Sequence, residues 1–311
     1  MIIGEGRHRY KWIDRWAVVP DTPSSQKNGR THGVVVSEAG NIIVFHQANP
    51  SVIVFDPDGK LLDAWGERFP GAHGMTLVRE GEDEFLWLTD QETTEVVKTT
   101  LEGTRVMALS RPDHSAYSHG KYSPTWVAVN EERFGGNDDI WVADGYGSGL
   151  VHRFDKLGNY VASINGEEGQ SGKFDCPHGI MFDYRSGKPE LTIADRGNKQ
   201  FQVYDQNGTY LKSFRDGISC PCASVIIGSE LFVPELNAKV TVLDRKNNFV
   251  CHLGDNEPTC SVKGWPDHPK SLIVPGKFNS PHSMASDAAG NLYIVEWIIG
   301  GRITKLERER L

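Results

Sequence analysis

The chain has 311 residues, enough to bury a large core, with 33 glycines, 8 tryptophans and 10% aromatic residues. Its formal net charge of −8 argues against a nucleic-acid surface, because phosphate binding depends on clustered lysine and arginine. Residues 1–10 lack the apolar core of a secretory signal, and no apolar run reaches the roughly 18 residues of a membrane span, so we expect a cytoplasmic protein without membrane contact.

A repeat of about 40 residues begins at His32. Within it, β-branched and aromatic runs at residues 33–36, 42–45, 52–55 and 61–65 alternate with turn residues such as Gly40-Asn41 and Asp58-Gly59. Four short strands in such a length are typical of one β-propeller blade. The composition and this pattern therefore predict an all-β fold.

The same pattern begins again at His73, Thr125, His178, Cys222 and His282. The last repeat has three strands before about residue 306, and the stretch 10–16 resembles the outermost strand of the first repeat, 59–65. We therefore predict one domain over residues 1–311, a six-bladed β-propeller. A strand at about residues 10–17 should complete the last blade, 281–307, and close the ring.

The six residues that begin the repeats, which we call the opening residues, should lie together. In a propeller the first strand of each blade lines the central channel, and the second strand runs antiparallel and returns to the same mouth. One mouth should therefore collect the opening residues and the loops after each second strand. The residues of interest in those loops are His46, Gln47, Tyr146, Arg196 and Trp297.

Histidine is the opening residue of the second, fourth and sixth repeats, at His73, His178 and His282. Alternate blades of six are related by about a three-fold rotation, so these imidazoles should converge on the channel axis. Three histidines leave coordination positions open for water or substrate, as in catalytic metal centres. We predict a metal site with Zn²⁺ as the default, while iron, cobalt and copper stay open. We expect His32 and Cys222 to line the pocket, with ligation by either left open.

These residues resemble those of NHL-repeat propellers and, among them, of the peptidyl-α-hydroxyglycine α-amidating lyases. The similarity covers most of the chain and begins with residues 41–46, which resemble the first blade of that family. The segments that resemble those bearing its three zinc ligands are Ala72-His73-Gly74, Pro177-His178 and Pro281-His282. Asp144-Gly145-Tyr146 resembles the segment of its catalytic tyrosine, and Ala194-Asp195-Arg196 that of an active-site arginine.

The resemblance implies a metal-dependent lyase that cleaves an α-hydroxyglycine-type hemiaminal into an amide and glyoxylate, or acts on a related small hydroxylated substrate. Tyr146 would take the proton of the substrate hydroxyl, and Arg196 would stabilise negative charge. Gln47 stands where the lyases have an arginine, so one cation is missing and the native substrate stays open. Contacts with substrate are expected from His32, His46, Gln47, Thr125, Cys222 and Trp297.

Two other functions remain open for this chain. One is a different metalloenzyme on the same scaffold, such as a hydrolase, an epimerase or a sugar-type lyase. The other is a non-catalytic NHL scaffold that binds a peptide or protein. For the enzyme, the expected partner is a small-molecule or peptide substrate.

Overall fold

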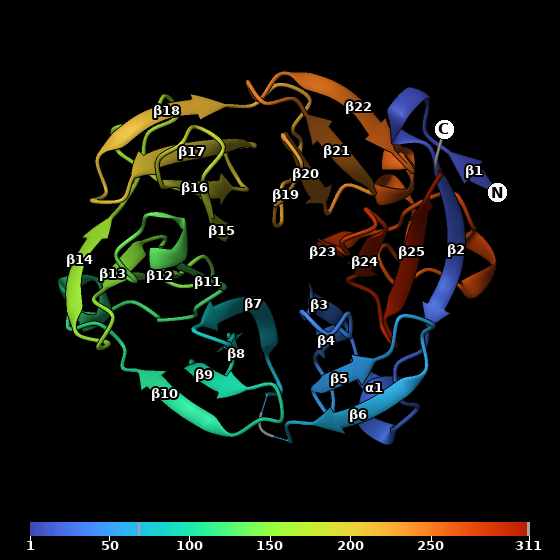
Figure 1. Cartoon of the computed structure of the whole chain (residues 1–311), viewed down its shortest axis with the longest axis horizontal. Coiled ribbons are helices and arrows are strands. Elements are labelled where there is room, and N and C mark those ends of the chain that lie inside the picture. Colours follow the sequence, from blue (N-terminus) through green and yellow to red (C-terminus); the bar gives the residue numbers. More distant parts are fainter. Residues whose placement is uncertain (68, 310–311) are drawn as a thin grey trace. The chain divides into compact units, whose positions relative to one another are not determined.

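The computed structural model describes residues 1–67 and 69–309, and most of its regular structure is antiparallel β-sheet (Figure 1). Its α-helix, α1 (Pro23–Lys27), is five residues long. Among the described residues, no helix has the length and apolar character needed to cross a membrane. The chain divides into two compact units. We call Met1–Pro70 with Cys222–Leu311 the terminal unit, and Gly71–Pro221 the middle unit.

The middle unit contains three four-stranded antiparallel sheets, in which each strand pairs with the next along the chain. The first consists of β7 (Ala72–Glu80), β8 (Asp83–Asp90), β9 (Val96–Thr100) and β10 (Arg105–Leu109). The second consists of β11 (Trp126–Val129), β12 (Ile140–Ala143), β13 (Val151–Phe154) and β14 (Tyr160–Ile164). The third consists of β15 (Pro177–Asp183), β16 (Glu190–Asp195), β17 (Gln200–Asp205) and β18 (Tyr210–Phe214).

The terminal unit also contains three sheets. One consists of β3 (Thr31–Val36), β4 (Ile42–His46), β5 (Val52–Phe55) and β6 (Leu61–Trp65). Another consists of β19 (Val225–Ile227), β20 (Glu230–Glu235), β21 (Lys239–Leu243) and β22 (Phe249–Leu253). The third has the order β1 (Ile2–Ile3), β2 (Tyr10–Ala17), β25 (Arg302–Arg308), β24 (Leu292–Glu296) and β23 (Pro281–Ser286).

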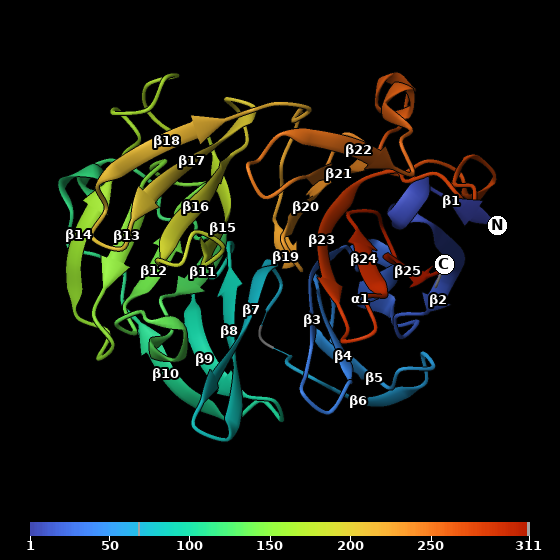
Figure 2. The ribbon, with the colours of Figure 1, turned by 45° about the horizontal axis from the view of Figure 1, so that its top comes forward.

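Each predicted repeat thus forms one sheet, and the described residues form six of them. This confirms the predicted fold class, a six-bladed β-propeller. The predicted N-terminal strand is β2, which pairs with β25 through Tyr10 opposite Arg308 and Trp12 opposite Leu306. Figures 1 and 2 both show β2, in blue, alongside β25, in red. The N-terminal strand therefore completes the last blade, as predicted, whereas the single domain over 1–311 stays a prediction.

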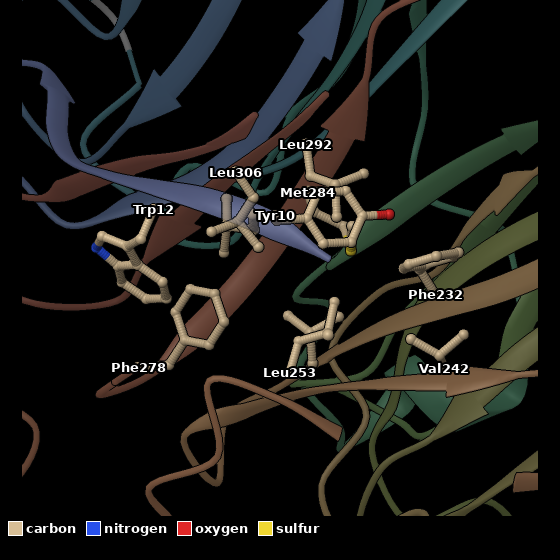
Figure 3. Close-up of a cluster of buried hydrophobic side chains, with 11 residues drawn as sticks. Tyr10, Trp12, Phe232, Val242, Leu253, Phe278, Met284, Leu292 and Leu306 are labelled. Atoms are coloured by element: carbon tan, nitrogen blue, oxygen red, sulfur yellow. The ribbon is translucent and has the colours of Figure 1, made fainter. Parts of the chain in front are cut away.

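The side chains of β2 explain why it pairs there. Tyr10 and Trp12 are buried and Lys11 between them is exposed, which is the period-two alternation of a strand with one face on a core. Figure 3 shows Trp12 beside Phe278, and the two ring centroids lie 4.7 Å apart. Burial of an aromatic side chain such as Trp12 stabilises the fold by roughly 1.5–3 kcal/mol. The N-terminal strand is thus part of a hydrophobic core that also includes β20 to β25.

The turn between the third and fourth strands is built alike in several sheets. At Asp56, the side-chain Oδ1 accepts hydrogen bonds from the backbone N–H groups of Asp58 and Lys60, each at 2.9 Å. Gly59 follows in the left-handed region at φ 86°, where a side chain would be strained. The same arrangement recurs at Asp155 and Asp205, so the Asp-x-x-Gly pattern in the sequence determines this turn locally.

Candidate functional site

The four opening histidines lie where the first strand loses its regular pairing. The register shifts between Thr31 and Gly33 in β3, Ala72 and Met75 in β7, Pro177 and Ile180 in β15, and Pro281 and Ser283 in β23. These shifts contain His32, His73, His178 and His282, none more than 2% exposed. A bulge gives one strand an extra residue and re-aims its side chain. The four histidines therefore occupy equivalent positions, each at a bulge in the first strand of its sheet.

The other two opening residues, Thr125 and Cys222, also occupy one common position. Thr125 lies directly before β11 and Cys222 three residues before β19, and both are fully buried. The backbone N–H of Thr125 donates to Ala143 O at 2.8 Å, and that of Cys222 donates to Pro234 O at 3.0 Å. Both acceptors directly precede an acidic residue at the end of the second strand: Ala143 precedes Asp144, and Pro234 precedes Glu235. Thr125 and Cys222 are therefore matched positions with different side chains.

Buried carboxylates at the ends of the second strands hold the segments that lead to the opening residues. Asp90 accepts from the N–H of Gly71 at 2.9 Å, and Asp144 accepts from that of Ser123 at 2.6 Å. Asp195 accepts from Asp175, and Glu296 from Asn279 and Ser280. Burial raises the pKa of Asp144, while hydrogen bonds from Ser148 and Ser123 oppose that shift. These carboxylates thus support the site structurally.

The middle unit brings four predicted site residues to a single oxygen atom. The hydroxyl of Tyr146, in the loop after β12, lies 3.1 Å from Nε2 of His73 and 3.1 Å from Nε2 of His178. Nη2 of Arg196, in the loop after β16, donates to the same hydroxyl at 3.3 Å. The Arg196 guanidinium also lies 5.3 Å from the centroid of the Tyr146 ring. Two imidazoles, a phenol and a guanidinium therefore form one cluster.

The proton positions on His73 follow from its second hydrogen bond. Its Nδ1 lies 2.8 Å from the carbonyl oxygen of Thr125, and because a carbonyl can only accept, Nδ1 carries the proton. In the neutral ring, Nε2 then presents a lone pair toward Tyr146, whose hydroxyl has one proton for two nearby nitrogens. An Nδ1–H group bonded to a backbone carbonyl is the usual support of a metal-binding histidine. The donor set therefore fits a transition metal.

Thr125 connects the backbones of the two histidines in this cluster. Its Oγ1 donates to the carbonyl oxygen of His178 at 2.8 Å, while its own carbonyl accepts from His73. The side chain is fully buried, so in this structure it links the two histidine strands. The substrate contact predicted for Thr125 stays a prediction.

The glycines on both sides of Tyr146 are required by close packing. A Cβ atom on Gly145 would lie 2.3 Å from Pro177 O, and one on Gly147 would lie 2.1 Å from Oδ1 of Asp144. Both distances are far below van der Waals contact, so the Gly-Tyr-Gly sequence lets this loop pack against the strand of His178 and around Asp144. The two glycines therefore allow the Tyr146 phenol to come close to the histidines.

Cys176 is a neighbour of the cluster that the sequence reasoning did not assign to the site. Its Sγ accepts from Nη2 of Arg196 at 3.2 Å, and its carbonyl accepts from the Arg196 N–H at 3.2 Å. Burial raises the pKa of the Cys176 thiol, and the Arg196 charge opposes this. Cys176 helps to orient Arg196. The one feature of the sequence that could have assigned it to the site is its position two residues before His178.

The terminal unit holds a second set of possible ligands. Nδ1 of His282 donates to the carbonyl of His32 at 2.9 Å, and the two ring centroids are 4.4 Å apart. A ring nitrogen of His282 lies within 4.8 Å of one of His32 and within 4.8 Å of the Cys222 Sγ. All three residues are buried. The chain therefore has buried histidine and cysteine groups that could bind a metal, and the predicted three-histidine site stays a prediction.

His46, Gln47 and Trp297 also belong to the terminal unit. His46 ends β4 with 1% of its surface exposed, and its desolvation lowers its pKa to about 4. The backbone N–H of Gln47 donates to Arg30 O at 2.9 Å. Arg30, which the sequence reasoning missed, lies 4.6 Å from the centroid of the Trp297 ring and forms a bidentate pair with Asp267. The predicted substrate contacts of these three residues stay predictions.

The fold and the repeated opening residues define a six-bladed β-propeller with buried histidines. No protein-family model matches the chain. Human NHL repeat-containing protein 3 is 29% identical over 192 residues, which cover 58% of this chain and 53% of that protein.

Two amidating lyases are also similar to the chain. A probable peptidyl-α-hydroxyglycine α-amidating lyase of Caenorhabditis elegans is 26% identical over 208 residues, which cover 58% of this chain and 57% of that protein. The peptidyl-α-hydroxyglycine α-amidating lyase 1 of Drosophila melanogaster is 25% identical over 324 residues, which cover 87% of this chain and 56% of that protein. The chain thus spans about half the length of these curated relatives. The predicted resemblance is confirmed.

Solved structures show the same fold. A catalytically inactive virginiamycin B lyase of Staphylococcus aureus, with quinupristin, matches with a TM-score of 0.59 at 13% identity, covering 96% of this chain and 99% of that chain. A gluconolactonase of Xanthomonas campestris matches with a TM-score of 0.61 at 12% identity, covering 92% and 89%. At such identities the structures support the propeller fold alone. Distant relatives and structural neighbours thus include enzymes.

Proposed function

We propose that this protein is a metal-dependent lyase that cleaves an α-hydroxyglycine-type hemiaminal into an amide and glyoxylate. The observation that carries the proposal is the hydroxyl of Tyr146, which lies 3.1 Å from the Nε2 atoms of His73 and His178 and accepts from Arg196. In this cluster the phenol can transfer a proton, and the guanidinium can stabilise the negative charge that develops. The similarity to two amidating lyases supports this reaction.

We further propose that His73, His178 and His282 hold the metal, with Zn²⁺ as the ion that imidazole donors favour. The support is the hydrogen bonding of two of them, because Nδ1 of His73 and Nδ1 of His282 each donate to a backbone carbonyl. In a neutral ring this leaves Nε2 as the ligand atom. When bound, the ion would supply a Lewis acid for the substrate hydroxyl.

The side chains would perform the following proton transfers. Tyr146 takes the hydroxyl proton, and the O–H electrons form the carbonyl of glyoxylate as the C–N bond breaks. The leaving amide nitrogen needs one proton, which Tyr146 can return. Arg196 donates to the Tyr146 hydroxyl, so it stabilises the phenolate that is needed before the transfer. It also offers a donor to the substrate carboxylate.

Metal analysis and glyoxylate release test the proposal together. Protein purified without added zinc should contain about one equivalent of a transition metal and should release glyoxylate from α-hydroxyhippurate. Less than about a tenth of an equivalent, in protein that also binds none when zinc is added, would favour the non-catalytic scaffold. Fully metallated protein that releases no glyoxylate would instead point to another metalloenzyme.

The second candidate is a different metalloenzyme for a small hydroxylated or lactone substrate. Gln47 favours it, because this position is neutral where the amidating lyases have arginine, and a cation that would bind a carboxylate is missing. A panel of lactones and hydroxy acids, incubated with the metallated protein, tests this alternative by product formation.

A further inference from the structure

Cys222 differs from the residue that occupies the matched position in the middle unit. Thr125 and Cys222 have the same backbone hydrogen bond to the second strand of their blades. Thr125 uses its hydroxyl to donate to the His178 carbonyl at 2.8 Å. A thiol is a weak hydrogen-bond donor, so cysteine is a poor replacement for that link. We therefore expect Cys222 to have a function that a sulfur atom performs better than a hydroxyl group.

The neighbours of Cys222 in the terminal unit indicate such a role. Its side chain is fully buried, and its Sγ lies within 4.8 Å of a ring nitrogen of His282. Because Nδ1 of His282 donates to the carbonyl of His32, Nε2 is the nitrogen left for a ligand. Two donors of one zinc ion, with bonds of about 2.0–2.3 Å, must lie within about 4.6 Å of each other. The sulfur and the imidazole are thus close to the separation that a shared ion requires.

We propose that the Cys222 thiolate is a ligand of the same metal as His282. This inference rests on the proposed function, to which it adds a fourth protein ligand. A thiolate would bring to the ion a negative charge that three neutral imidazoles do not. A thiolate also selects for soft or borderline ions, so the site should prefer zinc over manganese or magnesium.

Cobalt substitution tests the proposal without an activity assay. The apo-protein is loaded with Co²⁺, and its absorption is recorded in the visible range and in the near ultraviolet. Visible bands report that cobalt is bound, and a near-ultraviolet charge-transfer band reports a cobalt–thiolate bond. We expect both in the wild-type protein. Cys222→Ser should keep the visible bands, lose the near-ultraviolet band, and bind zinc at least about tenfold more weakly.

Cys251→Ser is the matched control, because Cys251 is a partly buried cysteine on β22 of the same unit. It should keep the near-ultraviolet band at full intensity. Even if Cys222→Ser fails to fold, a wild-type spectrum with visible bands and no near-ultraviolet band excludes a cysteine ligand. Visible bands without the near-ultraviolet band, or a band that persists in Cys222→Ser, overturn the ligand role and leave the proposed function intact. Absence of cobalt binding overturns both.

Discussion

The hydroxyl of Tyr146 is the single atom on which most of the proposed chemistry depends. It has one proton, and its neighbours are two imidazole nitrogens and one guanidinium donor. In the metal-free chain it can donate to one histidine. With the Nε2 atoms on the proposed metal, Arg196 remains as its donor, which favours the phenolate that takes and returns a proton. The ring is oriented by tight packing of its loop, where Gly145 and Gly147 leave no room for a Cβ atom.

Tyr146→Phe should lower kcat for glyoxylate release by about 10²- to 10⁴-fold, because it removes the proton acceptor and keeps the ring. Metal content and thermal stability should change little, since the proposed ligands remain. Tyr160→Phe is the control, because that hydroxyl bonds to Ser163 on an exposed strand. A Tyr146→Phe protein that keeps its rate within a factor of about three would exclude Tyr146 as the proton acceptor.

At the scale of the elements, the second strand positions the first. Its final carboxylate accepts from the backbone just before the opening residue, as Asp90 does from Gly71 and Asp144 from Ser123. These bonds join the end of one strand to the entry of its neighbour, close to where the bulges place the histidines. The position of each imidazole therefore depends on a contact between strands as well as on its own strand.

Asp90→Asn should destabilise the protein by about 1–3 kcal/mol in urea unfolding. Both of its oxygens are in use, since Oδ1 accepts from Glu92 and Thr93 and Oδ2 accepts from Gly71. An asparagine amide would turn one acceptor into a donor that faces a buried N–H group. Asp56→Asn is the control, because the backbone N–H groups of Asp58 and Lys60 bond to its Oδ1 alone, which asparagine keeps. Equal stability losses in the two variants would argue against this account.

At the scale of the whole molecule, each unit contains a buried histidine that resists protonation. Desolvation lowers the pKa of His46 in the terminal unit to about 4, and that of His152 in the middle unit to about 3. In the unfolded chain both titrate near 6.5. The stability that neutral His46 contributes is therefore full above about pH 6.5 and is lost as the pH falls toward 4, a total of roughly 3 kcal/mol.

We expect the free energy of unfolding to decrease steadily between about pH 6.5 and 4. His46→Asn should flatten part of this decrease, because its amide can donate to Ser51 O as the Nδ1 of His46 does, but has no proton to gain. Urea unfolding of both proteins at pH 7.5 and pH 5 measures the difference. If the variant lost as much stability as the wild type, His46 would not be a source of the acid sensitivity.

Much of the fold follows from local patterns in the sequence. The β-branched and aromatic runs, the turn residues between them and the likeness of residues 10–16 to 59–65 predicted the strands, and the structure confirms six sheets with β2 beside β25. Boundaries moved by one or two residues, since β3 begins at Thr31 where residue 33 was expected. The first strand of the fifth repeat, β19, is short, with three residues.

The sequence by itself determined which residue types recur at the opening of each repeat, because strand periodicity and turn residues act over a few neighbours along the chain. The tertiary structure decided what those residues do. The bulges at the histidines, the bonds of His73 to Thr125 and of Arg196 to Cys176, and the burial that lowers the pKa of His46 all depend on residues far apart in the chain. Such contacts leave no local pattern. The sequence therefore predicted that these residues lie at one mouth, and the folded chain showed that His73, His178 and Arg196 contact the Tyr146 hydroxyl.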